Sequence, residues 1–260
     1  MAFSNIQAGD RDSVRTITIT RPDKLNALNR ATINELQCAF DEARLDPSVR
    51  VVVLAGAGDK AFVAGADIGE LAALSPLDAL AFARAGQTLM HRIETLGKPV
   101  IARIQGFALG GGMEIAMACH VRIGSAKARL GQPEINLGVI PGFGGTQRLL
   151  RLAGRAAALE LCLLGAPIGA ERALQLGLLT RMVAHEKLDS EVTAIADQLA
   201  RSAPHALAGI LDAVLTGGEG ALDLGLDYEA HAFALCCASA DMREGTQAFL
   251  ERRRPAFSGT

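Results

Sequence analysis

The stretch Pro99–Cys119, which reads PVIARIQGFALGGGMEIAMAC, decides the fold. Its first part, Pro99–Gln105, is rich in apolar and β-branched residues and predicts a strand. The glycine-rich segment Gly106–Gly112 follows as a loop, and Met113–Cys119 predicts an almost wholly apolar helix. Because a strand leads here through a loop into a helix, the stretch is typical of a sheet built from β–α units.

Strands and helices alternate on both sides of this stretch. Further elements are predicted as strands at Val14–Thr20, Val49–Ala55 and Val121–Ser125, a helix capped by Asn29, and a helix over Pro76–Leu96. The uninterrupted apolar run of Val49–Ala55 predicts a strand buried on both faces. Ala128–Gly145 is rich in Gly and Pro and is expected to be mostly loop. The alternation predicts the α/β class.

Helices dominate beyond Thr146. They are predicted at Arg155–Leu164, Ala170–Leu176, Glu186–Ser202, Pro204–Leu215, Leu222–Cys237 and Asp241–Arg253. Asp241 followed by Glu244 has the spacing of a capping box and predicts the start of the last helix. We therefore expect a core over residues 1–200 and a helical region over 201–260.

Composition excludes several classes of protein. The chain has 260 residues, a formal net charge of −2 and 50% hydrophobic residues, which is typical of a folded chain with a substantial core. A net charge near zero gives no general attraction to nucleic acid or to an anionic membrane. The longest apolar candidate for a membrane span, Ile101–Ala118, contains Arg103 and Glu114. We expect neither nucleic acid nor membrane as a partner.

The N-terminus and the cysteines indicate the compartment. Met1–Asp12 has no apolar segment of the kind found in a secretory signal. The five cysteines are odd in number and form no C-x-x-C pair, which favours reduced thiols in a cytoplasmic protein.

Two common kinds of site are not supported. Gly56–Ala61 fits the pattern G-x-G-x-x-A, but a dinucleotide site needs a helix to start within the motif. The residues that follow, Phe62–Gly65, are poor helix formers, so we reject this interpretation. The five His are scattered without the spacing of metal ligands, and no metal site is expected.

The strongest functional candidate is Gly110–Glu114. Free N–H groups at a helix start can stabilise negative charge on an oxygen, and glycine lets a substrate approach the backbone. Glu114 is the one charged residue in Gly106–Cys119, and burying a carboxylate is unfavourable unless it is satisfied or its pKa shifts. The alternative is a glycine loop packed tightly against another backbone.

Two further segments are candidates for the same site. Glu134, in Gly131–Glu134, offers a second carboxyl for proton transfer, although an exposed loop acid is the alternative. The small-residue turn Ala64–Asp67 can supply another backbone N–H, while Asp67 is expected mainly to cap the following helix.

These segments, taken in order, resemble the enoyl-CoA hydratase/isomerase (crotonase) family. The resemblance runs over nearly the whole chain, and it rests on Arg21–Leu28, Ala61–Ile68, Lys98–Ile101, Gly106–Glu114, Gly131–Ile135, Gly138–Arg148 and Arg243–Phe249. It implies a spiral of ββα units with a C-terminal helical region that forms trimers, often paired as hexamers. The apolar residues expected at the subunit contact are Leu222, Leu224, Leu226, Phe233 and Leu235; ordinary packing within one chain is the alternative.

The resemblance also implies roles for single residues. The N–H groups of Ala66 and Gly111 would form an oxyanion hole around a thioester carbonyl. Glu114 and Glu134 match the two catalytic glutamates of the hydratases, and Glu134 is the expected proton donor to Cα. Residues implied at the substrate are Lys24, Leu25 and Ala27 at the adenine end of coenzyme A, Ala64, Asp67 and Ile68 at the thioester and pantetheine, Gly110, and Gly142 with an N–H near the carboxyls.

The implied activity is the addition of water across the 2,3 double bond of a 2-enoyl-CoA to give a 3-hydroxyacyl-CoA, as in fatty acid β-oxidation. Coenzyme A belongs to the substrate, and no metal, flavin or nicotinamide cofactor is expected. An enoyl-CoA isomerase, another acyl-CoA reaction on the same fold, and a non-catalytic acyl-CoA or RNA-binding protein are the alternatives. Two positions depart from the family pattern: His120 replaces an Asp, and Gly69 replaces Lys or another larger residue.

Overall fold

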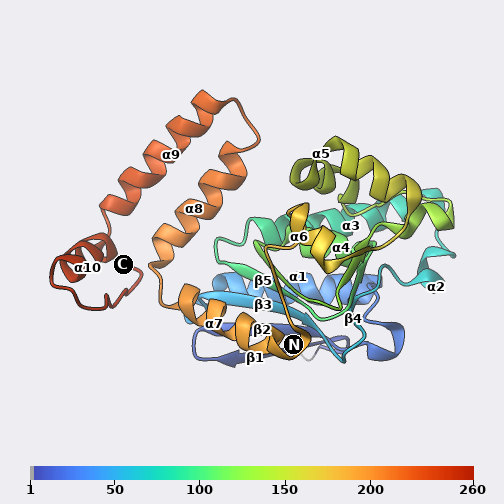
Figure 1. The fold of residues 1–260 in the computed structure, drawn as a ribbon, viewed down its shortest axis with the longest axis horizontal. Helices are drawn as coiled ribbons and strands as arrows, with labels where there is room; N and C mark the ends of the chain where they lie inside the picture. The colour runs from blue at the N-terminus through green and yellow to red at the C-terminus, as the bar shows by residue number, and fades with distance from the viewer. Residues whose placement is uncertain (1–2) are drawn as a thin grey trace.

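Two β-sheets carry the fold of the computed structural model, which describes residues 3–260 (Figure 1). The larger sheet has the order β1 (Ile6–Arg11), β2 (Val14–Ile19), β3 (Val51–Gly56), β5 (Val100–Ile104), β7 (Val121–Ser125) and β10 (Arg181–Val183). The smaller sheet has the order β4 (Ala61–Val63), β6 (Phe107–Leu109), β8 (Arg129–Gly131) and β9 (Ile168–Gly169). Within the sheets, β1 with β2 and β8 with β9 are antiparallel, and the other neighbouring strands are parallel.

Successive turns of the chain repeat one unit. A strand of the larger sheet is followed by a strand of the smaller sheet and then by helical structure. The three units are β3–β4 before α2 (Ile68–Leu71) and α3 (Pro76–Glu94), β5–β6 before α4 (Gly111–Ala118), and β7–β8 before a 3-10 turn (Pro133–Leu137) and α5 (Gly145–Leu164). This repetition confirms the predicted α/β spiral of ββα units.

Apolar side chains bury both faces of the larger sheet. On β3, Val52 and Leu54 belong to the main core, while Val51 and Val53 pack in a second cluster that includes residues of α7 (Leu188–Ala200). The two-sided burial predicted for this strand is therefore confirmed. In the main core, α1 (Arg30–Leu45) buries one apolar face, and its N-cap Asn29 accepts a hydrogen bond from the N–H of Thr32, as expected.

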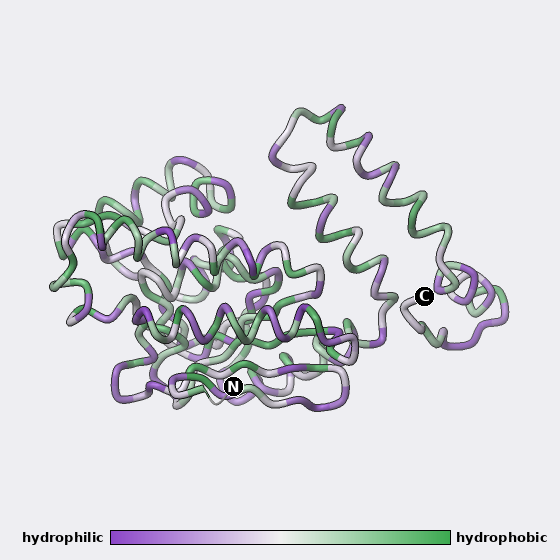
Figure 2. The backbone as a smooth tube through the Cα atoms, turned by 180° about the vertical axis from the view of Figure 1, so that it is seen from behind, coloured by the Kyte–Doolittle hydropathy of each residue, from purple (hydrophilic) through white to green (hydrophobic). Residues whose placement is uncertain are grey.

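The C-terminal helices extend away from the sheets. The hairpin of α8 (Pro204–Gly217) and α9 (Leu222–Cys237) projects from the rest of the molecule and leads to α10 (Ala240–Leu250) (Figure 1). Hydrophobic segments recur along both helices of the hairpin (Figure 2). The five apolar side chains singled out in α9 are each more than half exposed: Leu222, Leu224, Leu226, Phe233 and Leu235. The division of the chain into a core over 1–200 and a separate helical region over 201–260 stays a prediction. Within residues 3–260, no helix is long and apolar enough to cross a membrane.

Three features of local structure were not predicted. Strand β1 was missed, and Ala128–Gly145 contains strand β8 and a 3-10 turn. The helix predicted at Arg155–Leu164 is confirmed, but the helical segment from Gly145 that precedes it, across the non-helical Gly154, was missed.

The predicted capping box of the last helix was also wrong. Ser239 is the N-cap and accepts a hydrogen bond from the N–H of Met242. Asp241 is buried instead, and its carboxylate accepts the N–H groups of Ser258 at 2.7 Å and Gly259 at 3.0 Å. The side chain thus binds the C-terminal tail rather than its own helix.

Candidate active site

The candidate residues lie where three parallel strands of the smaller sheet end. Strands β4, β6 and β8 are neighbours, so their carboxyl ends meet at one edge of the sheet. The chain continues from them into Ala64–Asp67, Gly110–Glu114 and Gln132–Glu134. The N–H of Gly110 donates to the carbonyl of Gly131 at 2.8 Å, which joins two of these segments. Such an edge is the usual location of ligand sites in parallel sheets.

The backbone nitrogens of two candidate residues, Ala66 and Gly111, belong to segments that lie close together at this edge. A Cβ built on Gly111 would lie 3.6 Å from the nitrogen of Ala66. Gly111 is the first residue of α4, so its N–H has no acceptor within the helix. Among residues 3–260, neither of these N–H groups donates a hydrogen bond to a protein atom. Both N–H groups are therefore left without an acceptor from the described part of the chain.

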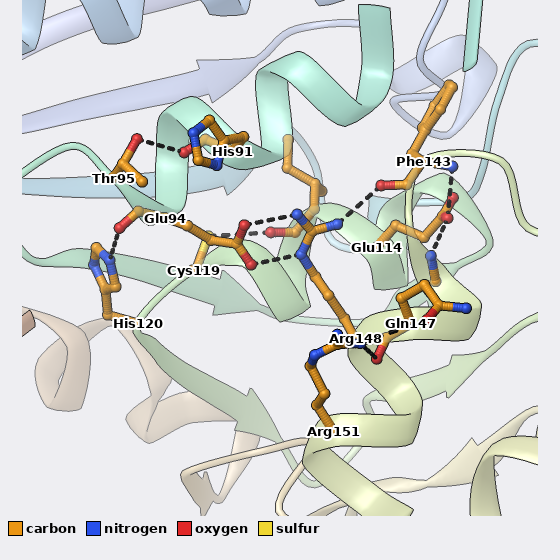
Figure 3. Close-up of polar contacts among 12 residues, drawn as sticks. His91, Glu94, Thr95, Glu114, Cys119, His120, Phe143, Gln147, Arg148 and Arg151 are labelled. Carbon is orange, nitrogen blue, oxygen red and sulfur yellow. Dashed lines mark hydrogen bonds and ion pairs between the residues drawn. The ribbon is translucent and has the colours of Figure 1, made fainter. Parts of the chain in front are cut away.

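Glu114 is buried on the inner side of α4. Glu114 is only 1% exposed. Its Oε1 accepts hydrogen bonds from the N–H of Phe143 at 2.8 Å and of Gly145 at 2.6 Å (Figure 3). Burial, followed by the charge of Glu134, raises the pKa of Glu114 to about 8, although the two N–H groups oppose the shift. The expected buried carboxyl is present, and it is held by backbone donors.

Glu134 forms the second carboxyl of the site. It lies in the 3-10 turn after β8, and burial raises its pKa to about 7. Gly110 lies directly against it, because a Cβ at this glycine would be 2.5 Å from Oε1 of Glu134. Gly110 has a φ of +51°, a conformation that residues with a side chain rarely adopt. The glycine thus allows the carboxyl and the start of α4 to approach each other.

Gln132 is a polar residue of the site that sequence reasoning missed. Its side chain is fully buried beside the second carboxyl. With its amide nitrogen turned toward Glu134, it donates to the two carboxylate oxygens at 3.2 and 3.1 Å. The one sequence feature that could have indicated Gln132 is its position two residues before Glu134. Nothing else in the sequence distinguishes it from an exposed loop residue.

A loop between two elements carries the donors of Glu114. Pro141–Gly145 comprises the loop before α5 and the first residue of that helix, and the carbonyl of Gly142 accepts a hydrogen bond from the side chain of Gln87 at 2.9 Å. The predicted Gly142 is therefore next to Phe143, whose N–H holds the carboxylate. The ring of Phe143 is buried and makes an edge-to-face contact with Phe82, with ring centroids 5.1 Å apart.

The residues predicted at the coenzyme A side lie along two adjoining segments. The carbonyl of Leu25 accepts the N–H of Ala64 at 3.0 Å, and the carbonyl of Leu28 accepts the N–H of Asp67 at 2.8 Å. These bonds lay the segment of Lys24, Leu25 and Ala27 beside the loop after β4.

An arginine further joins these two segments. Arg21 donates to the carbonyl of Ala27 and to the carboxylate of Asp67, the latter at 2.9 Å. Asp67 also caps α2, as predicted, by accepting the N–H of Gly69 at 3.1 Å, and Ile68 beside it is 54% exposed. An exposed apolar side chain therefore lies next to the loop of Ala66.

His120 keeps a structural role at its unusual position. Its Nδ1 accepts the N–H of Val100 at 2.9 Å, so Nε2 carries the proton and donates to the carbonyl of Glu94 at 3.0 Å (Figure 3). Burial lowers the pKa of His120, which favours this neutral form. His120 thus joins the start of β5 to the end of α3 through two hydrogen bonds to backbone groups.

The rejected dinucleotide motif does not lead into a helix. Gly56–Ala61 turns from β3 directly into β4, so no helix start is presented to a phosphate there.

Comparison with known proteins gives a consistent result. The family model described as enoyl-CoA hydratase/isomerase matches residues 9–260. The chain is 41% identical to the short-chain-enoyl-CoA hydratase of Clostridium acetobutylicum, covering 98% of this chain and 97% of the relative. It is 42% identical to the crotonyl-CoA hydratase of Syntrophomonas wolfei, over 99% of each chain. Its structure is similar to a crystal structure of an enoyl-CoA hydratase from Bacillus anthracis, with a TM-score of 0.96 and 38% identity over 99% of this chain and 100% of the other.

Proposed function

Because the chain belongs to the enoyl-CoA hydratase/isomerase family, we propose that it is an enoyl-CoA hydratase whose site is formed by Ala66, Gly111, Glu114 and Glu134. It adds water across the 2,3 double bond of a 2-enoyl-CoA and releases a 3-hydroxyacyl-CoA, as in fatty acid β-oxidation. The observation that carries the proposal is the pair of carboxyls beside two unpaired N–H groups at one sheet edge.

The two N–H groups act on the thioester carbonyl. Addition of water to the double bond builds enolate-like negative charge on the carbonyl oxygen. The N–H groups of Ala66 and Gly111 bind that oxygen, and each donor contributes roughly 3–4 kcal/mol to transition-state stabilisation. Because both donors are fixed backbone groups, little reorganisation is needed as the charge develops.

The two carboxyls divide the proton transfers. Glu114 and Glu134 hold the attacking water: its oxygen bonds to Cβ, and one proton reaches Cα, for which Glu134 is the donor. Both pKa values are raised, to about 8 and about 7. Ionising both would place two negative charges in one buried site, so near neutral pH the pair holds one proton between them. One carboxyl is then available as acid and the other as base.

The remaining predicted residues bind the rest of the substrate. Lys24, Leu25 and Ala27 border the adenine end of coenzyme A, and Ala64, Asp67 and Ile68 border the thioester and pantetheine. Gly110 lets the substrate reach the start of α4, and the N–H of Gly142 lies near the carboxyls. The reaction requires no metal or redox cofactor, because its steps are proton transfers and addition of water.

We include assembly and location in the proposal. Residues 201–260 form a helical region for a homotrimer or a hexamer, supported by the exposed apolar side chains of α9. The five cysteines are all free, in keeping with a cytoplasmic protein. Neither nucleic acid nor a membrane is a partner in this scheme.

The test follows the loss of enoyl-thioester absorbance when the protein is added to crotonyl-CoA. We expect rapid loss with the native chain, and a rate about 10²–10⁴-fold lower for Glu114→Gln and for Glu134→Gln. Glu160→Gln is the control, because this carboxylate is on the surface and pairs with Arg172. Binding of crotonyl-CoA without turnover by the native chain would contradict hydration and favour another reaction such as isomerisation. Full activity of either site variant would refute the two-carboxyl mechanism.

A further inference from the structure

We propose that Arg148 is a positioning residue that holds the loop Pro141–Gly145 in the shape that directs two N–H groups at Glu114. The inference rests on the proposed function, since Glu114 matters here as an acid–base group. Arg148 does not touch the carboxyls itself in any hydrogen bond; it acts through the backbone that they contact.

The guanidinium of Arg148 connects α5 to two other parts of the molecule (Figure 3). Its Nε and Nη2 donate to the carboxylate of Glu94 at 2.5 and 2.6 Å, and its Nη1 donates to the carbonyl of Phe143 at 3.0 Å. Phe143 therefore has both backbone groups engaged: its carbonyl accepts from Arg148, and its N–H donates to Glu114. The backbone of Phe143 therefore links the guanidinium of Arg148 to the carboxylate of Glu114.

The loop is shaped around this guanidinium. Gly144 has a φ of +105°, and a Cβ at this position would overlap Nη1 of Arg148. Gly145, the next residue, supplies the second N–H to Glu114, at 2.6 Å. The arginine thus lies against the turn that aligns both donors.

The partner of the arginine is itself held in place. Glu94 is the last residue of α3, and its carbonyl accepts the Nε2–H of His120. The side chains of Arg148 and Glu94 are 17% and 23% exposed, so this pair is shielded much more than the outer ion pairs of the same protein. The two-pronged contact with Glu94 fixes the plane of the guanidinium and leaves Nη1 for the loop. A lysine has no equivalent planar group and cannot make both contacts in this way.

Loss of the arginine should change the titration of Glu114. The groups that shift the pKa of Glu114 are Glu134 from the 3-10 turn, Arg148 from α5, and the N–H donors of the loop. The charges of both carboxyls also raise the pKa of Cys162 in α5. Glu94 faces the site only through its ion pair with Arg148. The positive charge of Arg148 and the two N–H groups all lower the pKa of Glu114. If the loop relaxes, all three effects weaken, and the pKa of Glu114 rises further.

The experiment compares pH profiles of crotonyl-CoA hydration for Arg148→Gln, Arg148→Lys and the native chain. Arg148→Gln should lower kcat about 10²-fold, the loss that a 1 Å misplacement of a catalytic group can cause. It should also move the basic limb of the profile to higher pH, because Glu114 has the higher pKa of the pair, with little change in KM. Arg148→Lys should keep kcat low, because it restores the charge without the geometry. Native kcat in Arg148→Lys would overturn the inference.

A matched control lies one turn away on the same helix. Arg151 also forms an ion pair, with Glu219 at 3.0 Å, but both side chains are more than half exposed. Arg151→Gln should behave like the native chain; an equal loss of kcat would mean that any change in α5 reduces activity, and would refute a specific role of Arg148.

A second readout is independent of turnover. The carboxyl carbon of Glu114 can be titrated by NMR in glutamate-labelled protein, with Glu114→Gln as the assignment control. An upward shift in Arg148→Gln is expected, and an unchanged titration overturns the inference. Should that variant not fold, Arg148→Lys keeps the charge without the planar contacts and must shift the titration in the same direction, or the inference is wrong. Absence of turnover in the native chain would refute the proposed function, while the titration would still decide the role of Arg148.

Discussion

Replacing Glu114 by Gln should make the protein increasingly more stable than the native chain as the pH rises from 5 to 8. Gln has the same shape, and its carbonyl oxygen can still accept the N–H groups of Phe143 and Gly145. It carries no charge at any pH. The native carboxyl instead keeps its proton in the folded chain up to a pKa of about 8, whereas in the unfolded chain it ionises near its ordinary pKa. The variant therefore gives up acid–base chemistry and gains free energy of unfolding.

The size of this effect follows from the raised pKa. Glu114 titrates at about 8 in the folded chain, against an ordinary value of 4.5. Between these values the folded state binds the proton more tightly than the unfolded state. The stabilisation is fully present below pH 4.5 and is lost as the pH rises through 8. One proton corresponds to about 1.4 kcal/mol per pH unit, so about 4 kcal/mol is expected over three units.

The assay is urea unfolding of both proteins at pH 5, 6, 7 and 8, at one fixed protein concentration so that any association contributes equally. The difference in free energy of unfolding between Glu114→Gln and the native chain should grow steadily with pH. Glu160→Gln, a change in an exposed carboxylate, should show no such trend. Parallel pH curves for Glu114→Gln and the native chain would refute the claim that burial raises the pKa of this carboxyl.

Two glycine substitutions test close contacts of the site. Gly110→Ala introduces a side chain at a φ of +51° and 2.5 Å from Oε1 of Glu134. It should lower stability by about 1–3 kcal/mol and reduce kcat for crotonyl-CoA; an unchanged kcat would show that the carboxyl is not confined there. Gly86→Ala adds a methyl group that overlaps the buried ring of Phe143, and should cost about 1–3 kcal/mol in thermal or urea unfolding. Gly9→Ala is its control, with no atom within 4 Å of the new methyl, and equal losses in both variants would contradict the contact.

Long, periodic elements were predictable from the sequence, whereas very short ones were not. Leu222–Cys237 and the helix after Asn29 follow from their patterns and caps. Strands such as β4, β6 and β8 have three residues each, too few to show an alternation. The capping prediction for Asp241 failed because its hydrogen-bond partners, Ser258 and Gly259 in the C-terminal tail, are distant in sequence. A local capping pattern cannot reveal such a contact.

The site was predictable where a residue broke its local pattern. Glu114 stands out in an apolar helix, and the glycines before it suggest an approach to the backbone. Gln132 and Arg148 do not stand out, since polar residues in a loop and in an amphipathic helix are ordinary. Their importance lies in burial and in contacts with Glu134 and Phe143, which only the folded arrangement displays.

The order of strands in the smaller sheet places the two N–H donors and the carboxyl of Glu134 on different loops. The N–H of Ala66 follows β4, and that of Gly111 follows β6, whereas the carboxyl of Glu134 follows β8, one strand spacing of about 4.8 Å farther along the edge. Under the proposed function, activation of the carbonyl belongs to two turns of the spiral and part of the proton transfer to a third. A different side chain at position 134 would leave both N–H donors in place. One loop can therefore change the fate of the activated thioester while the other two keep binding it, which gives the fold a simple route to new reactions.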